Sequence, residues 1–126
     1  MTKIFIAFLY PSLLFLFSCS GSNCDQLPNK YSSYDEAIET IEASHFKIEE
    51  SVNTSKSSWI RGAEYYSCDG ATGFLILQTD NQDYLYSGVT LEIWQGFKNS
   101  ESFGIYYNHK IKHKFTFNLN INQESH

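Results

Sequence analysis

The spacing of apolar residues along this chain alternates between the period of a helix and the period of a strand. In the first periodic segment, Ala37, Ile38 and Ile41 recur at the spacing of one helix face. Ser33 and Glu36 form a capping box, in which the serine side chain accepts from an early amide and the glutamate bonds back. We therefore predict an N-terminal helix that begins after Ser33 and ends near residue 44.

The next segments have the period of two that is typical of strands. Phe74, Ile76 and Gln78 alternate with the residues between them, and turn-forming residues lie at 68–73 and 80–82. We predict a three-stranded antiparallel meander, preceded by a short extended segment in which the alternation is weak. The predicted strands are residues 59–66, 74–79 and 83–86, and the extended segment is residues 46–52.

A helical period returns after the meander. Thr90 is a predicted N-cap for a helix with Trp94 and Phe97 on its apolar face. A second helix is predicted over residues 101–112, where Phe103, Tyr107 and Ile111 recur at four-residue spacing. Residues 115–121 then alternate as a strand would. The predicted fold is α+β, a small antiparallel three-stranded meander packed against two C-terminal helices, with an N-terminal helix preceding it.

The beginning of the chain has the pattern of an export signal. Lys3 precedes an apolar run at residues 4–17, which is shorter than the roughly 18 residues that a membrane-spanning helix needs. Leu16-Phe17-Ser18-Cys19 resembles a lipobox, so we predict a lipoprotein signal peptide over residues 1–18, lipid attachment at Cys19 and a polar tether over residues 19–32. Plain secretion and an uncleaved anchor are the alternatives. A diacyl group would hold the protein on a bacterial cell membrane or outer membrane.

Export changes the interpretation of the two remaining cysteines. Cys24 and Cys68 would lie in an oxidising compartment, where two thiols can pair. We predict a disulfide between them, which would also fix the N-terminal segment to the domain. Separate thiols, or a nucleophilic Cys68, are the alternatives.

The formal net charge of the chain is −5, and removal of residues 1–18 makes it −6. A chain with this charge does not attract nucleic acid as a whole. Basic residues nevertheless gather near the end of the last predicted helix, and they are His109, Lys110, Lys112, His113 and Lys114. They form either a solvated helix end or a patch for an anionic surface. The two histidines lie four residues apart but lack a third ligand nearby, so we predict no metal site.

Two tyrosines of the last predicted strand are further candidates. Tyr84 and Tyr86 point to the same face, where they either contact a ligand or cap the core. The chain lacks a Ser-His-acid set, a glycine-rich phosphate loop and a metal-protease motif, so we expect no enzyme activity and no cofactor. The candidate binding surface comprises Tyr84, Tyr86, Tyr106, Asn108, Lys110, Lys112 and Lys114.

An ordered set of short motifs resembles the KTSC domain, a small domain found alone or at the C-terminus of some lysyl-tRNA synthetases. The set runs from residue 57 to about residue 115, and its members are Ser57-Ser58-Trp59-Ile60, Tyr65, Tyr84-Leu85-Tyr86, Gly88-Val89, Trp94, Phe97, the segment 102–108, Ile111 and Phe115. Two departures are visible. Thr90 stands where the family commonly has Pro, and the first hairpin turn is enlarged around Cys68.

The export pattern and the resemblance together divide the chain into five parts. They are a leader at 1–18, a tether at 19–32, residues 33–56 with the N-terminal helix, a KTSC-like domain at 57–115 and a C-terminal tail at 116–126. It implies no established biochemical function. We expect a non-enzymatic, membrane-anchored binding or adaptor module of the bacterial cell envelope, which contacts another envelope protein or a polymer. The alternative is a nucleic-acid binding module of the tRNA type.

Overall fold

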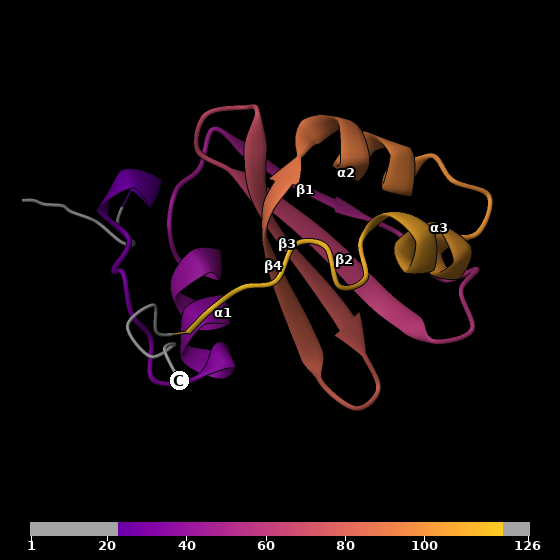
Figure 1. The fold of residues 1–126 in the computed structure, drawn as a ribbon, viewed down its shortest axis with the longest axis horizontal. Coiled ribbons are helices and arrows are strands. Elements are labelled where there is room, and N and C mark those ends of the chain that lie inside the picture. The colour runs from indigo at the N-terminus through magenta and orange to yellow at the C-terminus, as the bar shows by residue number, and fades with distance from the viewer. Residues whose placement is uncertain (1–22, 120–126) are drawn as a thin grey trace, which may run out of the picture.

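The structure is a computed structural model that describes residues 23–119 (Figure 1). The predicted signal peptide and Cys19 lie outside the described residues. The described part is an α+β fold, in which four strands form one antiparallel sheet in the order β1-β2-β3-β4. Their bounds are β1 (Ile48–Val52), β2 (Ile60–Ser67), β3 (Thr72–Thr79) and β4 (Asp83–Thr90).

The prediction of three strands was wrong by one, because the segment predicted only as extended is the edge strand β1. It pairs with β2 along its whole length, from Ile48 opposite Ser67 to Val52 opposite Ala63. Its three central residues are all exposed, so the strand lacks the alternation of buried and exposed positions on which the sequence argument depended.

The helices are η1 (Cys24–Gln26), α1 (Tyr34–Glu42), α2 (Leu91–Lys98) and α3 (Phe103–Lys110). Each α-helix begins after a hydroxyl residue whose oxygen accepts from the amide three positions later. The donor to acceptor distances are 3.0 Å at Ser33, 3.1 Å at Thr90 and 3.2 Å at Ser102. The predicted N-cap at Thr90 is therefore confirmed.

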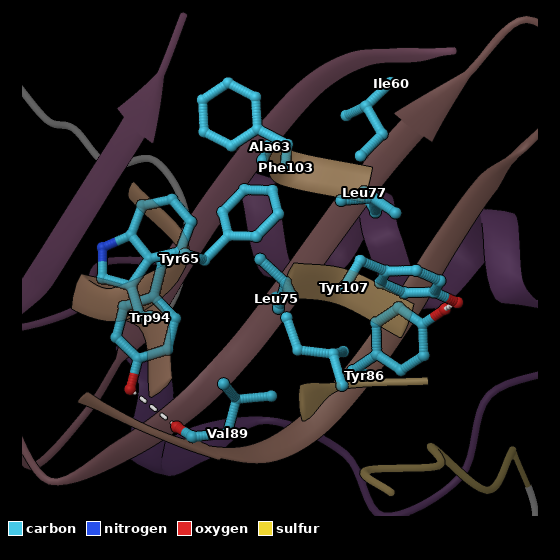
Figure 2. Packing of buried hydrophobic residues seen from close by; sticks show 12 residues of the cluster. Ile60, Ala63, Tyr65, Leu75, Leu77, Tyr86, Val89, Trp94, Phe103 and Tyr107 are labelled. Atoms are coloured by element: carbon cyan, nitrogen blue, oxygen red, sulfur yellow. Dashed lines mark hydrogen bonds between the residues drawn. The ribbon is translucent and has the colours of Figure 1, made fainter. Parts of the chain in front are cut away.

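The sheet is covered on both faces by apolar side chains. On one face, Leu75 and Leu77 pack with α2 and α3, and Tyr65 stacks on Trp94 with ring centroids 5.2 Å apart (Figure 2). On the other face, Ile76 packs with α1. Figure 1 shows α1 apart from the α2–α3 pair, and each layer has its own hydrophobic cluster. This arrangement explains why three successive residues of β3 are buried.

The segment after α3 was predicted as a strand, and in its described part that prediction was wrong. It makes a single bridge to the sheet, between Thr116 and Tyr86. Phe115 packs into the cluster beneath α2 and α3, whereas Phe117 and Leu119 pack into the cluster beneath α1. The segment thus passes around the outer edge of β4 from one face to the other, which also produces an alternating pattern.

The start of the described chain is held against the domain. The sulfurs of Cys24 and Cys68 lie at disulfide distance, with the two Cα atoms 5.8 Å apart. The amide of Cys24 also donates to the carbonyl of His45 at 3.0 Å, and Tyr31 is buried in the cluster beneath α1. Part of the predicted tether therefore belongs to the folded unit.

Candidate functional site

A hollow of about 610 Å³ lies beside β4. We call it the β4 groove. Strand β4 contributes Tyr84 and Tyr86, α3 contributes Tyr107 and Asn108, and the segment after α3 contributes its remaining basic and apolar walls. The C-terminal end of α3 and the path of the following segment around the strand edge therefore create the groove.

Two phenols meet at the inner wall of the groove. The hydroxyls of Tyr86 and Tyr107 form a short hydrogen bond, and both side chains are buried (Figure 2). Burial, and then the contact with Tyr107, raise the pKa of Tyr86 well above its ordinary value. The Tyr86 hydroxyl therefore stays protonated at neutral pH. The contact between the two hydroxyls uses one of the two protons, which leaves the second as a donor that can face the groove.

Exposed aromatic rings surround these phenols. Tyr34, Trp59 and Tyr84 are 44%, 38% and 38% exposed, and all three line the groove. Among the described residues only one other large apolar side chain, Ile105, is exposed to this degree. A gathering of exposed aromatic rings around one hollow is a common property of binding sites.

The indole of Trp59 is held in place from two sides. Its ring meets the ring of Tyr107 edge to face, with centroids 5.6 Å apart. A Cβ atom at Gly104 would lie only 2.8 Å from the indole Nε1, so glycine is needed at this position for Trp59 to approach α3. Upstream, the hydroxyl of Ser57 accepts from the amide of Ile60 at 3.0 Å and shapes the loop that carries Trp59.

Charged groups of both signs, together with polar groups, line the groove. Asn108 lies in the last turn of α3, Lys112 and His113 follow the helix, and Asp83 begins β4. His113 has a positive φ of 63°, a conformation that non-glycine residues rarely adopt. Burial, followed by the nearby carboxylates of Glu64 and Asp35, raises the pKa of Asp83. The groove therefore combines aromatic surface with balanced charge.

Of the predicted binding surface, Tyr84, Tyr86, Asn108 and Lys112 line the groove. Tyr106 lies elsewhere, because its hydroxyl donates to the carbonyl of Ile93 at 3.0 Å and joins α3 to α2.

Lys110, Lys114 and His109 are exposed and do not line the groove, so the predicted basic cluster does not converge on one point. Sequence reasoning missed Trp59 and Tyr34 as groove residues, and Gly104 as the residue that lets Trp59 approach α3. Trp59 and Gly104 belong to the motifs that resemble the KTSC domain, and this was the available signal.

Two further properties concern the described residues alone. No helix between residues 23 and 119 is long and apolar enough to cross a membrane. Within the same part of the chain, no three His, Cys, Asp or Glu side chains gather in a way that would hold a metal ion.

Comparison with known proteins identifies one family. No curated protein and no solved structure matches the chain. The sequence of residues 56–115 matches the KTSC domain family, and this range contains β2, β3, β4, α2 and α3. The groove residues Trp59, Tyr84, Tyr86, Tyr107 and Asn108 all lie within it. The chain therefore contains a KTSC domain, to which η1, α1 and β1 are added on the N-terminal side.

Proposed function

We propose that this protein is a non-enzymatic binding module, held on a membrane of the bacterial cell envelope by lipid at Cys19, and that it takes its ligand in the β4 groove. The observation that carries the proposal is the gathering of Tyr34, Trp59 and Tyr84 around one hollow. Exposed aromatic rings are costly in water, and a ligand that covers them removes this cost.

The buried phenols favour binding over proton transfer. A raised pKa keeps the Tyr86 hydroxyl protonated at neutral pH, so it suits hydrogen bonding to a ligand better than removing a proton from a substrate. Nucleic acid is a weaker candidate, because the chain is acidic and Lys110 and Lys114 do not line the groove.

The topology supports an anchor on the N-terminal side. Successive hairpin turns of an antiparallel sheet lie at opposite ends of it, so the β2–β3 turn with Cys68 lies at the end opposite the β3–β4 turn. Cys24 contacts the first of these turns, and Asp83 and Tyr84 of the groove follow the second. Cys24 therefore lies near the end of the sheet opposite Asp83 and Tyr84, so an anchor upstream of Cys24 is compatible with a ligand at that part of the groove.

Lipidation is tested by feeding cells an alkyne-labelled fatty acid. We expect the full-length protein to carry the label in the membrane fraction and the Cys19→Ser variant to lose it. A Cys24→Ser variant, which changes the neighbouring cysteine, should keep the label. Equal labelling of wild type and Cys19→Ser would remove the anchor from the proposal.

Ligand binding in the groove is tested by photo-crosslinking in cells with a benzophenone amino acid. We expect adducts when it replaces Tyr84 and none when it replaces Ile105, which is 62% exposed on α3 and lies outside the groove. The adduct at position 84 should decrease when Trp59→Ala is added. Equal adducts at both positions, or none at position 84, would show that the groove is not the binding site.

A further inference from the structure

We infer that the ligand of the β4 groove is a neutral oligosaccharide. This inference rests on the proposed function, because it takes the groove as the binding site, and it adds the chemical class of the ligand. Its basis is the combination of exposed aromatic faces, adjacent hollows that meet at one tryptophan, and a lining with charges of both signs.

The aromatic rings match the shape of a sugar. A pyranose ring has one face of C–H groups and a perimeter of hydroxyls, so it packs its apolar face on an aromatic ring and bonds at its edges. Trp59 and Tyr84 are both 38% exposed and offer such faces, and the contacts with Tyr107 and Gly104 hold Trp59 in place before a ligand arrives. A platform that is already ordered loses little conformational entropy on binding.

The surface around Trp59 suits a ligand of several units. Trp59 lines the β4 groove, a second hollow of about 180 Å³ with Asn81 and Tyr84, and a third of about 220 Å³ with Ser58 and Ser102. The second and third hollows offer hydroxyl and amide side chains. A chain of sugar rings can place one ring on the indole and its neighbours in the adjoining hollows.

The charges at the groove argue for an uncharged ligand. Lys112 from the segment after α3 and Asp83 from β4 both line the groove, so its lining carries charges of both signs. Asp83 already lies in the field of Glu64 and Asp35, and the whole chain is acidic. A polyanion would meet these carboxylates, and a polycation would meet Lys112, whereas a neutral polymer meets neither penalty.

The spare hydroxyl proton of the Tyr86 and Tyr107 pair adds a donor at the inner wall, and Asn108 adds an amide. A sugar that carries an acetamido group presents a carbonyl to such donors. An oligomer of N-acetylglucosamine is therefore the appropriate probe.

An extended peptide fits this position less well. Peptides that add to a sheet need the backbone groups of an edge strand. Along β4, the amide of Ser87 already donates to the carbonyl of Phe115 at 3.1 Å, and Thr116 bridges to Tyr86.

The test is a titration of the full-length protein, in a detergent without a sugar headgroup, with N-acetylglucosamine tetramer. Heat of binding and tryptophan emission are both followed. We expect saturable binding and a change in emission from Trp59, since the other tryptophan, Trp94, is fully buried. Trp59→Ala and Tyr84→Ala should each weaken binding at least tenfold, and Ile105→Ala should change it less than twofold.

Near-ultraviolet circular dichroism from Trp94 shows whether each variant keeps its core. Absence of binding by both the tetramer and a glucose tetramer to folded wild type would overturn the inference, and so would equal binding by Trp59→Ala. Salt-sensitive binding of a sulfated polysaccharide in place of the neutral oligomers would also overturn it. If crosslinks from position 84 still form in cells, the proposed function stands and only the ligand class is wrong.

Discussion

The inner wall of the β4 groove depends on two phenols that satisfy each other. We expect Tyr86→Phe to lower the free energy of unfolding by about 1–2 kcal/mol, because the buried hydroxyl of Tyr107 loses its partner. Urea denaturation measures the difference. Tyr84→Phe is the matched control, since its side chain is more exposed, and it should stay within about 0.5 kcal/mol of wild type. Equal losses in the two variants would contradict the pairing.

A second single-residue effect is expected at Gly104. Gly104→Ala places a Cβ atom 2.8 Å from the Trp59 indole nitrogen, so the indole must move away from α3. We expect stronger quenching of tryptophan emission by acrylamide, because Trp59 becomes more exposed while Trp94 stays buried. The free energy of unfolding should change little. The helix preference of alanine over glycine, up to about 1 kcal/mol, offsets the cost of displacing the indole. Unchanged quenching would mean that glycine is not required there.

The sequence identified part of the groove and missed the rest for a physical reason. Tyr84, Tyr86 and Asn108 were predicted from the strand period and the family motifs, and they line the groove. Trp59 and Tyr34 come from a loop and from α1, and only the packing of these elements on the sheet brings them to β4. Their positions along the chain contain no information about that proximity.

Among the elements, β1 is joined to α2 by one carboxylate. Glu50 accepts from the Trp94 indole and from the Lys98 ammonium, each at 2.8 Å, and these bonds, the Lys98 bond first, lower the pKa of Glu50. We expect Glu50→Ala to cost about 1–3 kcal/mol, since the buried indole N–H loses its acceptor. Thermal unfolding monitored by circular dichroism measures this. Glu50→Gln keeps an acceptor and should lose less, and a loss as large as that of alanine would contradict the role of the indole bond.

The contact between α1 and the sheet should depend on pH. Burial, and then a hydrogen bond with Glu64 and its charge, raise the pKa of Glu42 from 4.5 to about 7, with Asp83 and Glu39 contributing. The folded state therefore retains a proton that the unfolded chain releases, so this stabilisation is complete below about pH 4.5 and is lost as the pH rises through about 7.

Glu42→Gln mimics the protonated form, and unfolding at a series of pH values measures its effect. The variant should be more stable than wild type at pH 8, and the difference should vanish near pH 4. The gain should be at most about 1 kcal/mol, because Glu42 is only partly buried and solvent screens its charge. Glu101→Gln, at an exposed glutamate that does not contribute to the pKa of Glu42, is the control. A larger advantage at pH 4 than at pH 8 would reverse the assigned sign.

For the molecule as a whole, the pair Cys24 and Cys68 closes a loop with a sequence separation of 44. We expect the double variant Cys24→Ser, Cys68→Ser to lose up to about 4 kcal/mol of stability, because the unfolded chain gains freedom. Guanidinium denaturation of wild type with and without reductant gives the same comparison without a substitution. Identical midpoints in all samples would show that the thiols are not bonded.

The fold class was predictable, whereas the number of layers was not. Alternation along a strand reports one buried face, and Leu75, Ile76 and Leu77 are all buried because helices cover both faces of the sheet. β1 was predicted only as an extended segment, because an edge strand with exposed Glu49 and Glu50 shows little alternation of apolar and polar residues. In both cases tertiary contacts, and not local periodicity, determine burial.

The segment after α3 covers part of the outer edge of β4, and this matters where many copies of the protein lie close together on a membrane. Lipid-anchored copies would share a two-dimensional surface, where neighbours meet often and unprotected strand edges can join into fibrils. Here one outer strand carries Glu49 and Glu50, whose like charges repel another copy, and the opposite one is partly occupied by Phe115 and Thr116. The same polypeptide stretch that walls the groove thus also discourages self-association of the sheet.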